Sequence, residues 1–269
     1  MVINKRKVRG DILLYTSSQF LYKLVGYGVL MMLTRHLSQD RMGEFFLAAS
    51  LAGVTAMLAE LGTNSYMTRA LASRAEERVT IFSEVISFQV PVLLILFALL
   101  NGAVWLAKPH LLDILALTSV YIILEQAYLA FGALFVGMHR VSYNVICGVA
   151  AKLLLIGLVA VAVNRELTLN GILLCYIAAN CVLLGIAVYL SRRVIRGIRF
   201  SWDLKETRRF VGIALSFFGI GLLGTIHFSA DTLMLGSLST FAAVATYETA
   251  FKLLEAARFV IRAVYTIYF

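Results

Sequence analysis

Apolar residues gather in long stretches along the chain instead of alternating with polar ones. Eight of these stretches hold about twenty residues or more, the length that a helix needs to cross a hydrocarbon core of about 30 Å. The longest connection between them, residues 191–209, is too short for a useful soluble domain. The pattern therefore predicts an all-α, polytopic integral membrane protein with about eight transmembrane helices. The predicted spans are 12–34, 42–63, 82–107, 111–137, 141–164, 168–190, 210–236 and 241–268.

Composition narrows the choice of class further. Hydrophobic residues make up 61% of the 269 residues and charged residues 14%, whereas soluble domains have about 45–50% and about 25%. The chain has only two prolines, and its mean hydropathy is +0.87. Its three cysteines all lie inside apolar stretches. These values exclude a disordered chain, a disulfide scaffold and a water-facing globule.

Basic residues are shared unequally between the two sides that the predicted spans define. With a cytoplasmic N-terminus, the outer loops hold only Arg35, Arg41, Lys108 and Arg165. This asymmetry follows the positive-inside rule and predicts a cytoplasmic N-terminus. Because topology accounts for most of the net charge of +9, we do not expect nucleic acid as a partner. The cytoplasmic segments would hold Lys5, Arg6, Lys7, Arg9, Arg69, Arg74, Arg78, Arg140, Arg192, Arg193, Arg196, Arg199, Lys205, Arg208 and Arg209.

The connection between the first two predicted spans resembles the connection between the last two in sequence. We call these two connections, with the adjoining residues, the first and the last corner. LTRHLS at 33–38, followed by GEF at 43–45, resembles MLGSLS at 234–239, followed by ATY at 245–247. The offset is 201 and becomes 202 after a one-residue gap. Six spans separate the copies, so both enter from the same side, as in a parallel repeat. We therefore expect a six-helix lobe over 1–200 and the first two helices of a second lobe over 201–269, a shortened form of a protein with at least twelve spans.

Three lysines fall near the middle of predicted spans, where a charge facing lipid is costly. Lys23, Lys152 and Lys252 each lie about eleven residues from one end of their span. A lysine at the bilayer centre costs about 2.5–3.5 kcal/mol on insertion scales. We therefore expect these side chains to face one shared polar cavity. Lys23 also continues a polar stripe with Gln19 and Tyr27, because residues three and four apart share a helix face.

Other charged residues in the spans leave alternatives open. Glu248 can pair with Lys252, and Glu255 with Arg258, inside their own helix. Such pairs would neutralise much of the last span without any functional role.

Three further residues are candidates for ion coupling. His227 and Asp231 are four residues apart, and histidine titrates near neutral pH. The two side chains could carry a coupling proton or form a structural hydrogen bond. Glu125 lies at a depth from which its carboxylate could pair with Lys23 or Lys152, or take part in coupling.

The glycines at 219, 221 and 224 match the spacing of a dinucleotide-binding loop. That loop needs a strand before it and a helix that starts at it, whereas this segment lies inside a predicted span. Small residues there favour close helix packing or a bend. The sequence has no Cys/His metal spacing and no nucleophile or zinc-protease motif. We therefore predict neither an enzyme nor a bound cofactor or metal.

Three short signatures occur in order along the chain. They are LTRHLS with GEFFLA (33–38, 43–48), ELGTN with TRALA (60–64, 68–72), and DTLMLG with YETAFKL (231–236, 247–253). These signatures resemble those of the polysaccharide flippases of the MOP (multidrug/oligosaccharidyl-lipid/polysaccharide exporter) superfamily, and the resemblance covers the whole chain. It implies two lobes of six or more spans in the bacterial inner membrane, and export or flipping of a lipid-linked oligosaccharide on a polyprenyl pyrophosphate, such as an O-antigen or exopolysaccharide unit.

The resemblance also suggests roles for individual residues. Lys23, Lys152 and Lys252 would hold the anionic head group, because lysine is a point-charge partner of phosphate. Arg69, which matches a family arginine, and Arg258 would be further cavity residues. Besides the substrate and membrane lipids, the expected partners are other polysaccharide-assembly membrane proteins. The alternatives are a cation-coupled multidrug exporter of the same superfamily and a truncated, non-transporting membrane product.

Overall fold

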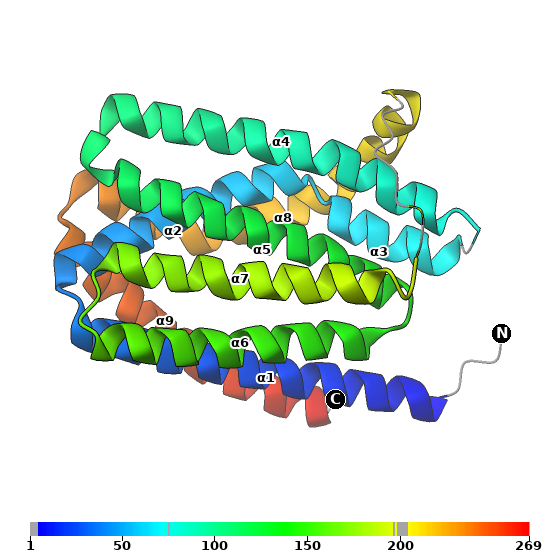
Figure 1. The fold of residues 1–269 in the computed structure, drawn as a ribbon, viewed down its shortest axis with the longest axis horizontal. Helices are drawn as coiled ribbons and strands as arrows, with labels where there is room; N and C mark the ends of the chain where they lie inside the picture. Colours follow the sequence, from blue (N-terminus) through cyan, green and yellow to red (C-terminus); the bar gives the residue numbers. More distant parts are fainter. Residues whose placement is uncertain (1–4, 75, 196, 198–203, 269) are drawn as a thin grey trace.

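The structure is a computed structural model, which describes residues 5–74, 76–195, 197 and 204–268, with side chains over 16–74, 76–195, 197, 206–219 and 221–255. All regular elements in these residues are helical, which confirms the all-α class. The helices run along one common axis (Figure 1). They are α1 (Lys5–His36), α2 (Gln39–Glu60), α3 (Thr63–Ser73), α4 (Arg78–Ala107), the short 3-10 helix η1 (Pro109–Leu111), α5 (Leu112–Gly137), α6 (Val141–Asn164), α7 (Leu169–Ser191), α8 (Leu204–Leu238) and α9 (Phe241–Tyr268).

Each of the eight predicted spans corresponds to a helix, but fewer meet a strict apolar criterion. In the described residues, α2, α4, α5 with η1, α6 and α7 are long and apolar enough to cross a membrane, and a bent α8 makes a sixth. The polytopic membrane class is therefore confirmed, with five or six such spans among the described residues. Helix α1 is not among them, and it carries Gln19 and Lys23 within its apolar stretch.

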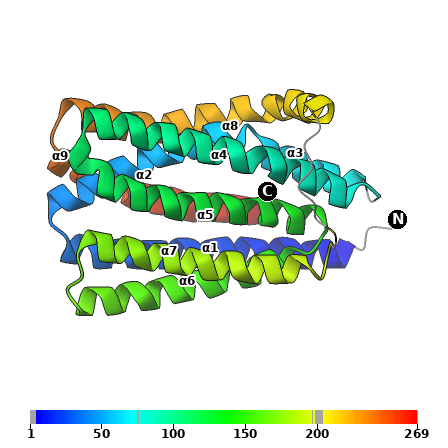
Figure 2. The same ribbon diagram turned by 45° about the horizontal axis from the view of Figure 1, so that its top comes forward.

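Helix α5 lies at the centre of the bundle and packs against α2, α3, α4, α6 and α7. Figure 2 shows α8 and α6 at opposite edges of the bundle with α5 between them. Helices α8 and α9 both pack against α2. The division into lobes near residue 200 stays a prediction.

Helix α3 lies between two predicted spans, in residues 64–81, where the sequence pattern predicted no helix. The chain breaks after α2 because Leu61 and Gly62 both adopt left-handed backbone conformations, with φ of 50° and 74°. A side chain at Gly62 would meet the Ala214 carbonyl oxygen of α8 at 2.5 Å. The new helix buries Met67 and Leu71. With 11 residues, this helix is too short and too polar to be recognised as a membrane span from the sequence.

The glycine-rich segment of α8 produces a bend. The parts Glu206–Gly219 and Gly221–Leu238 meet at 47°. A Cβ atom at Gly221 would overlap the methyl group of Met57 in α2. The structure thus confirms that these glycines permit a bend and close packing of helices.

The two similar corners have equivalent backbone structure. In the first, the amide of Met42 donates to the Ser38 carbonyl at 3.0 Å, and in the last, the amide of Val244 donates to the Thr240 carbonyl at 3.2 Å. The hydroxyls of Ser38 and Thr240 cap α2 and α9 in the same way, each accepting from the amide three residues later. These pairs differ by 202 throughout, which corrects the predicted offset of 201 within the corner.

The corners also lie side by side at one end of the bundle, as Figure 1 shows for the blue and orange ends of the helices. A Cβ atom at Gly43 would overlap the backbone carbonyl of Phe241. The outer-loop residues Arg35, Arg41 and Lys108 belong to this end of the bundle. The start of α1, the end of α7 and the start of α8 lie at the opposite end.

Candidate functional site

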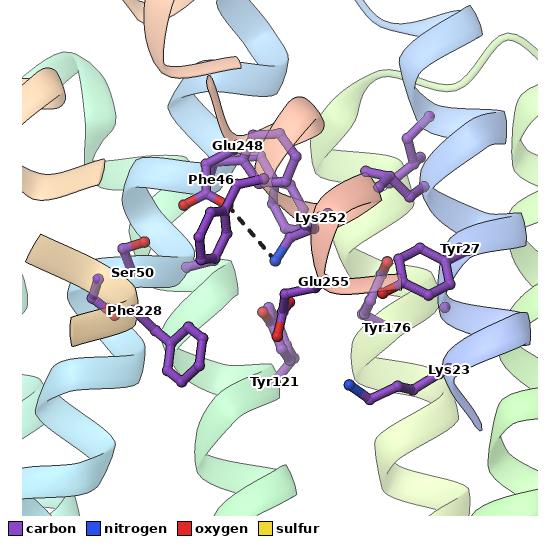
Figure 3. A pocket seen from close by; sticks show the side chains of 17 residues that line it. Lys23, Tyr27, Phe46, Ser50, Tyr121, Tyr176, Phe228, Glu248, Lys252 and Glu255 are labelled. Atoms are coloured by element: carbon purple, nitrogen blue, oxygen red, sulfur yellow. Dashed lines mark ion pairs between the residues drawn. The ribbon is translucent and has the colours of Figure 1, made fainter. Parts of the chain in front are cut away.

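A central cavity of about 520 Å³ opens between α1, α2, α5, α7, α8 and α9. Its ionisable residues include Lys23 on α1 and Glu248, Lys252 and Glu255 on α9. Figure 3 shows Lys23, Lys252 and Glu255 pointing into the same space. Aromatic rings make up much of the remaining wall. They belong to Tyr27, Phe45, Phe46, Tyr121, Tyr176, Phe228 and Phe251.

Glu248 is the most enclosed charge of the central cavity, with only 5% of its surface exposed. Its Oε2 atom lies 3.7 Å from the ammonium nitrogen of Lys252. The hydroxyl of Thr232, on α8, donates a short hydrogen bond to Oε1. The structure therefore shows the ion pair within α9 that the sequence left as an alternative. The charge of Lys252 is partly offset by this carboxylate.

A second cavity, of about 580 Å³, lies between α1, α5, α6 and α7, with Thr68 of α3 at its edge. Lys23, Glu125 and Lys152 all line it. Tyr128 donates a hydrogen bond of 2.5 Å to Oδ1 of Asn144, another lining residue. Among the side chains that the structure describes, no carboxylate lies within ion-pair distance of Lys152.

The three predicted lysines therefore face two adjoining cavities instead of one. Lys23 lines both cavities, while Lys252 lines the central one and Lys152 the second. Lys23 is therefore the lysine at which the two cavities adjoin.

Two tyrosines of the central cavity lie close together. The rings of Tyr121 and Tyr176 have centroids 5.4 Å apart, and both line the central cavity. Glu125, four residues after Tyr121 on α5, lines the second cavity. The two cavities therefore adjoin along α5.

The repeat brings equivalent positions together around the central cavity. Five pairs of lining residues differ by 202, which shows that matching faces of the two corners form its walls. The charges, in contrast, are not repeated, because Lys252 corresponds to Ser50, and Glu248 to Phe46. The five pairs are Gly26 and Phe228, Tyr27 and Ser229, Phe46 and Glu248, Ala49 and Phe251, and Ser50 and Lys252.

A comparison with known families shows the family of this chain. A family model described as a polysaccharide biosynthesis protein matches residues 8–268. The chain belongs to this family. It is the family of polysaccharide and O-antigen flippases of the MOP superfamily, and its members are transporters rather than enzymes. No curated protein and no solved structure matches the chain. In general terms, the chain is a transporter of polysaccharide or lipid-linked oligosaccharide.

Two of the residues predicted to take part in ion coupling, His227 and Asp231, line neither of the two cavities. His227 is exposed, and its ring contacts Phe228 with centroids 5.3 Å apart. Asp231 accepts a short hydrogen bond from the hydroxyl of Tyr247, on α9. Within the described side chains, His227 and Asp231 form neither a hydrogen bond nor an ion pair with each other. Their coupling role stays a prediction.

Of the two predicted arginines, only Arg69 has a described side chain, and its position differs from the expectation. The guanidinium of Arg69, on α3, lies 4.7 Å above the ring of Phe217, on α8, and Arg69 lines neither of the two cavities. The side chain of Arg258 lies outside the described residues. Sequence reasoning missed Thr232 and Tyr176, because contacts between helices leave no signal in local spacing.

Proposed function

We propose that this chain moves an oligosaccharide linked to a polyprenyl pyrophosphate across the membrane by alternating access, with the central cavity as the substrate site. The observation that carries this proposal is the position of Lys23 at the junction of the two cavities. A phosphate group in the central cavity would meet this ammonium first. The walls of that cavity come from both copies of the repeat, so rocking one copy against the other would open it to alternate sides.

The chemistry of the central cavity suits such a ligand. Its volume falls within the range of about 300–1,000 Å³ that is usual for small-molecule sites. Carboxylates and tyrosine hydroxyls can accept hydrogen bonds from sugar hydroxyls. Lys23 can bind phosphate as a point charge. We assign a strong role to Lys23 because it lines both cavities. We assign a weaker role to Lys252 than to Lys152, because Glu248 already offsets the charge of Lys252.

The orientation in the membrane is part of the proposal. The end of the bundle with the starts of α1 and α8 and the end of α7 would face the cytoplasm, following the positive-inside rule. We place the protein in the bacterial inner membrane with a cytoplasmic N-terminus. Other polysaccharide-assembly membrane proteins would supply its substrate and receive its product.

The experiment measures surface polysaccharide in a strain that lacks its own flippase. The wild-type chain should restore display, and Lys23→Ala with Lys152→Ala should abolish it at equal membrane abundance. Lys252→Ala should reduce display less, because Glu248 already offsets its charge. Arg165→Ala, which removes an exposed charge at the far end, is the matched control. Normal display by the double variant would refute the cavity role.

A second candidate function is cation-coupled export of drugs. Glu248 and Glu255 in the central cavity favour it, since carboxylates bind cations. It predicts that Glu255→Gln lowers efflux of a cationic dye while polysaccharide display stays unchanged. Failure of the wild-type chain in both assays would instead favour a non-transporting membrane product.

A further inference from the structure

A third cavity, which shares no lining residue with the two described above, lies at the end of α7. It has a volume of about 680 Å³. Its lining includes Tyr189, Arg192 and Arg193, with Phe131 of α5 contributing an apolar wall. The position at the end of a membrane-spanning helix places this groove at the level of lipid head groups.

Arg193 is held in a defined position at the rim of this groove. Its Nη2 atom donates a hydrogen bond of 2.8 Å to the hydroxyl of Tyr189. Its guanidinium carbon lies 5.0 Å from the centroid of the same ring. A stacked guanidinium keeps its outer donors in one plane, which suits a phosphate with two acceptor oxygens.

The turn after α7 is anchored on both sides of the arginines. The amide of Arg193 donates to the Leu190 carbonyl at 3.1 Å, and the amide of Ile195 donates to the Ser191 carbonyl at 2.8 Å. Ile195 is 5% exposed and packs in the core. Because these carbonyls are already paired, the negative end of the helix dipole opposes an anion less strongly.

The charge of this groove is not balanced by carboxylates. Among the residues whose side chains the structure describes, no acidic one lines it. Within the described part of the chain, neither Arg192 nor Arg193 forms an ion pair, whereas Arg41, Arg74 and Arg209 each pair with a glutamate three residues away. Positive-inside topology accounts for basic residues at this end, but it does not require two unpaired arginines around one apolar-walled groove.

We propose that this groove binds the phosphodiester head group of an anionic phospholipid. Arg192 and Arg193 contact the phosphate, and an acyl chain follows Phe131 and Val188 toward the apolar core. Basic pockets between transmembrane helices are the usual form of such sites. The site is separate from the transport cavities and does not depend on the proposed substrate.

The test uses the full chain in nanodiscs of phosphatidylcholine with a rising fraction of phosphatidylglycerol. The readouts are the midpoint of thermal unfolding and the number of phosphatidylglycerol molecules retained in native mass spectra. Phosphatidylglycerol should raise the midpoint of the wild type. Arg192→Gln with Arg193→Gln should lose most of this rise and retain fewer lipids. Arg35→Gln with Arg165→Gln, which removes the same charge at the far end, should behave as the wild type.

Three results would overturn the proposal. The first is an Arg192/Arg193 double variant whose unfolding midpoint responds to phosphatidylglycerol as the wild type does. The second is an equal loss of this response in the far-end control. The third is a full rise of the midpoint with inorganic phosphate in phosphatidylcholine alone, which would mean a free-phosphate site. If the glutamine variant does not insert, Arg192→Lys with Arg193→Lys keeps the charge. This variant should insert and lose part of the rise, because lysine lacks the planar fork. A full rise in the lysine variant would refute the arginine geometry.

Discussion

Gly43 lies where α2 comes closest to the start of α9, and its replacement by alanine probes the packing of the two corners. A Cβ atom there would overlap the carbonyl oxygen, carbonyl carbon and Cα of Phe241. All three are backbone atoms, so no side-chain rotation can relieve the overlap. Either α9 must move away from α2 or the corner must distort.

The magnitude follows from two opposing effects. Alanine is favoured over glycine in a helix by about 1 kcal/mol, and overpacking of a tight site costs about 1–3 kcal/mol. We expect the upper end of that range, since the opposing atoms are backbone. Gly43→Ala should therefore destabilise the protein by about 2 kcal/mol. Gly53→Ala is the matched control, because Gly53 lies on the same helix and a Cβ there meets nothing within 4 Å.

The assay compares the free energies of unfolding of both variants in the same detergent, with unfolding monitored by circular dichroism. The helix-propensity gain is common to both, so their difference isolates the overlap at Gly43 and should be about 3 kcal/mol. Equal stabilities for Gly43→Ala and Gly53→Ala would show that α2 and α9 are not in contact at this point, and would refute the packing of the two corners.

Two further predictions concern contacts that α8 makes with neighbouring elements. Glu248→Ala should lower the free energy of unfolding by about 1.5–3 kcal/mol, because a charge-assisted hydrogen bond from Thr232 is lost. Thermal unfolding measures this loss of stability. Wild-type stability of the variant would contradict the hydrogen bond. Gly62→Ala should lower the stability of the fold by about 1–3 kcal/mol from its positive φ alone, and by more from the overlap with the Ala214 carbonyl. The yield of folded protein in detergent measures this loss, with Gly53→Ala again as the control. An undiminished yield would rule out the tight α2–α3 turn.

Much of the fold was predictable because it depends on local properties. The length and hydropathy of each apolar stretch correctly predicted eight helices, since a helix satisfies its own backbone hydrogen bonds wherever it lies. The glycines near residue 220 indicated close helix packing or a bend, and the structure has a bend of 47° there. The short helix α3 was missed because its 11 residues carry few apolar side chains, and it depends on burial of Met67 and Leu71 by neighbouring helices.

The candidate site was predictable in kind but not in arrangement. Midplane lysines indicated polar cavities, because a charge facing lipid is too costly. The sequence could not tell that Lys23 would line two cavities, or that Tyr121 and Tyr176 would line the central one. Nor could it distinguish whether Glu248 would pair with Lys252 or with another helix, since both arrangements fit the same spacing.

The sequence by itself determined that this chain is a helical membrane protein with charges buried between its spans, and its signatures indicated the family. Both depend on residue type and spacing along one chain. The tertiary structure alone decided which faces of α1, α2, α8 and α9 meet, and therefore which charges share a cavity. The physical reason is that a contact between helices depends on their rotation and separation, which follow from packing all side chains at once.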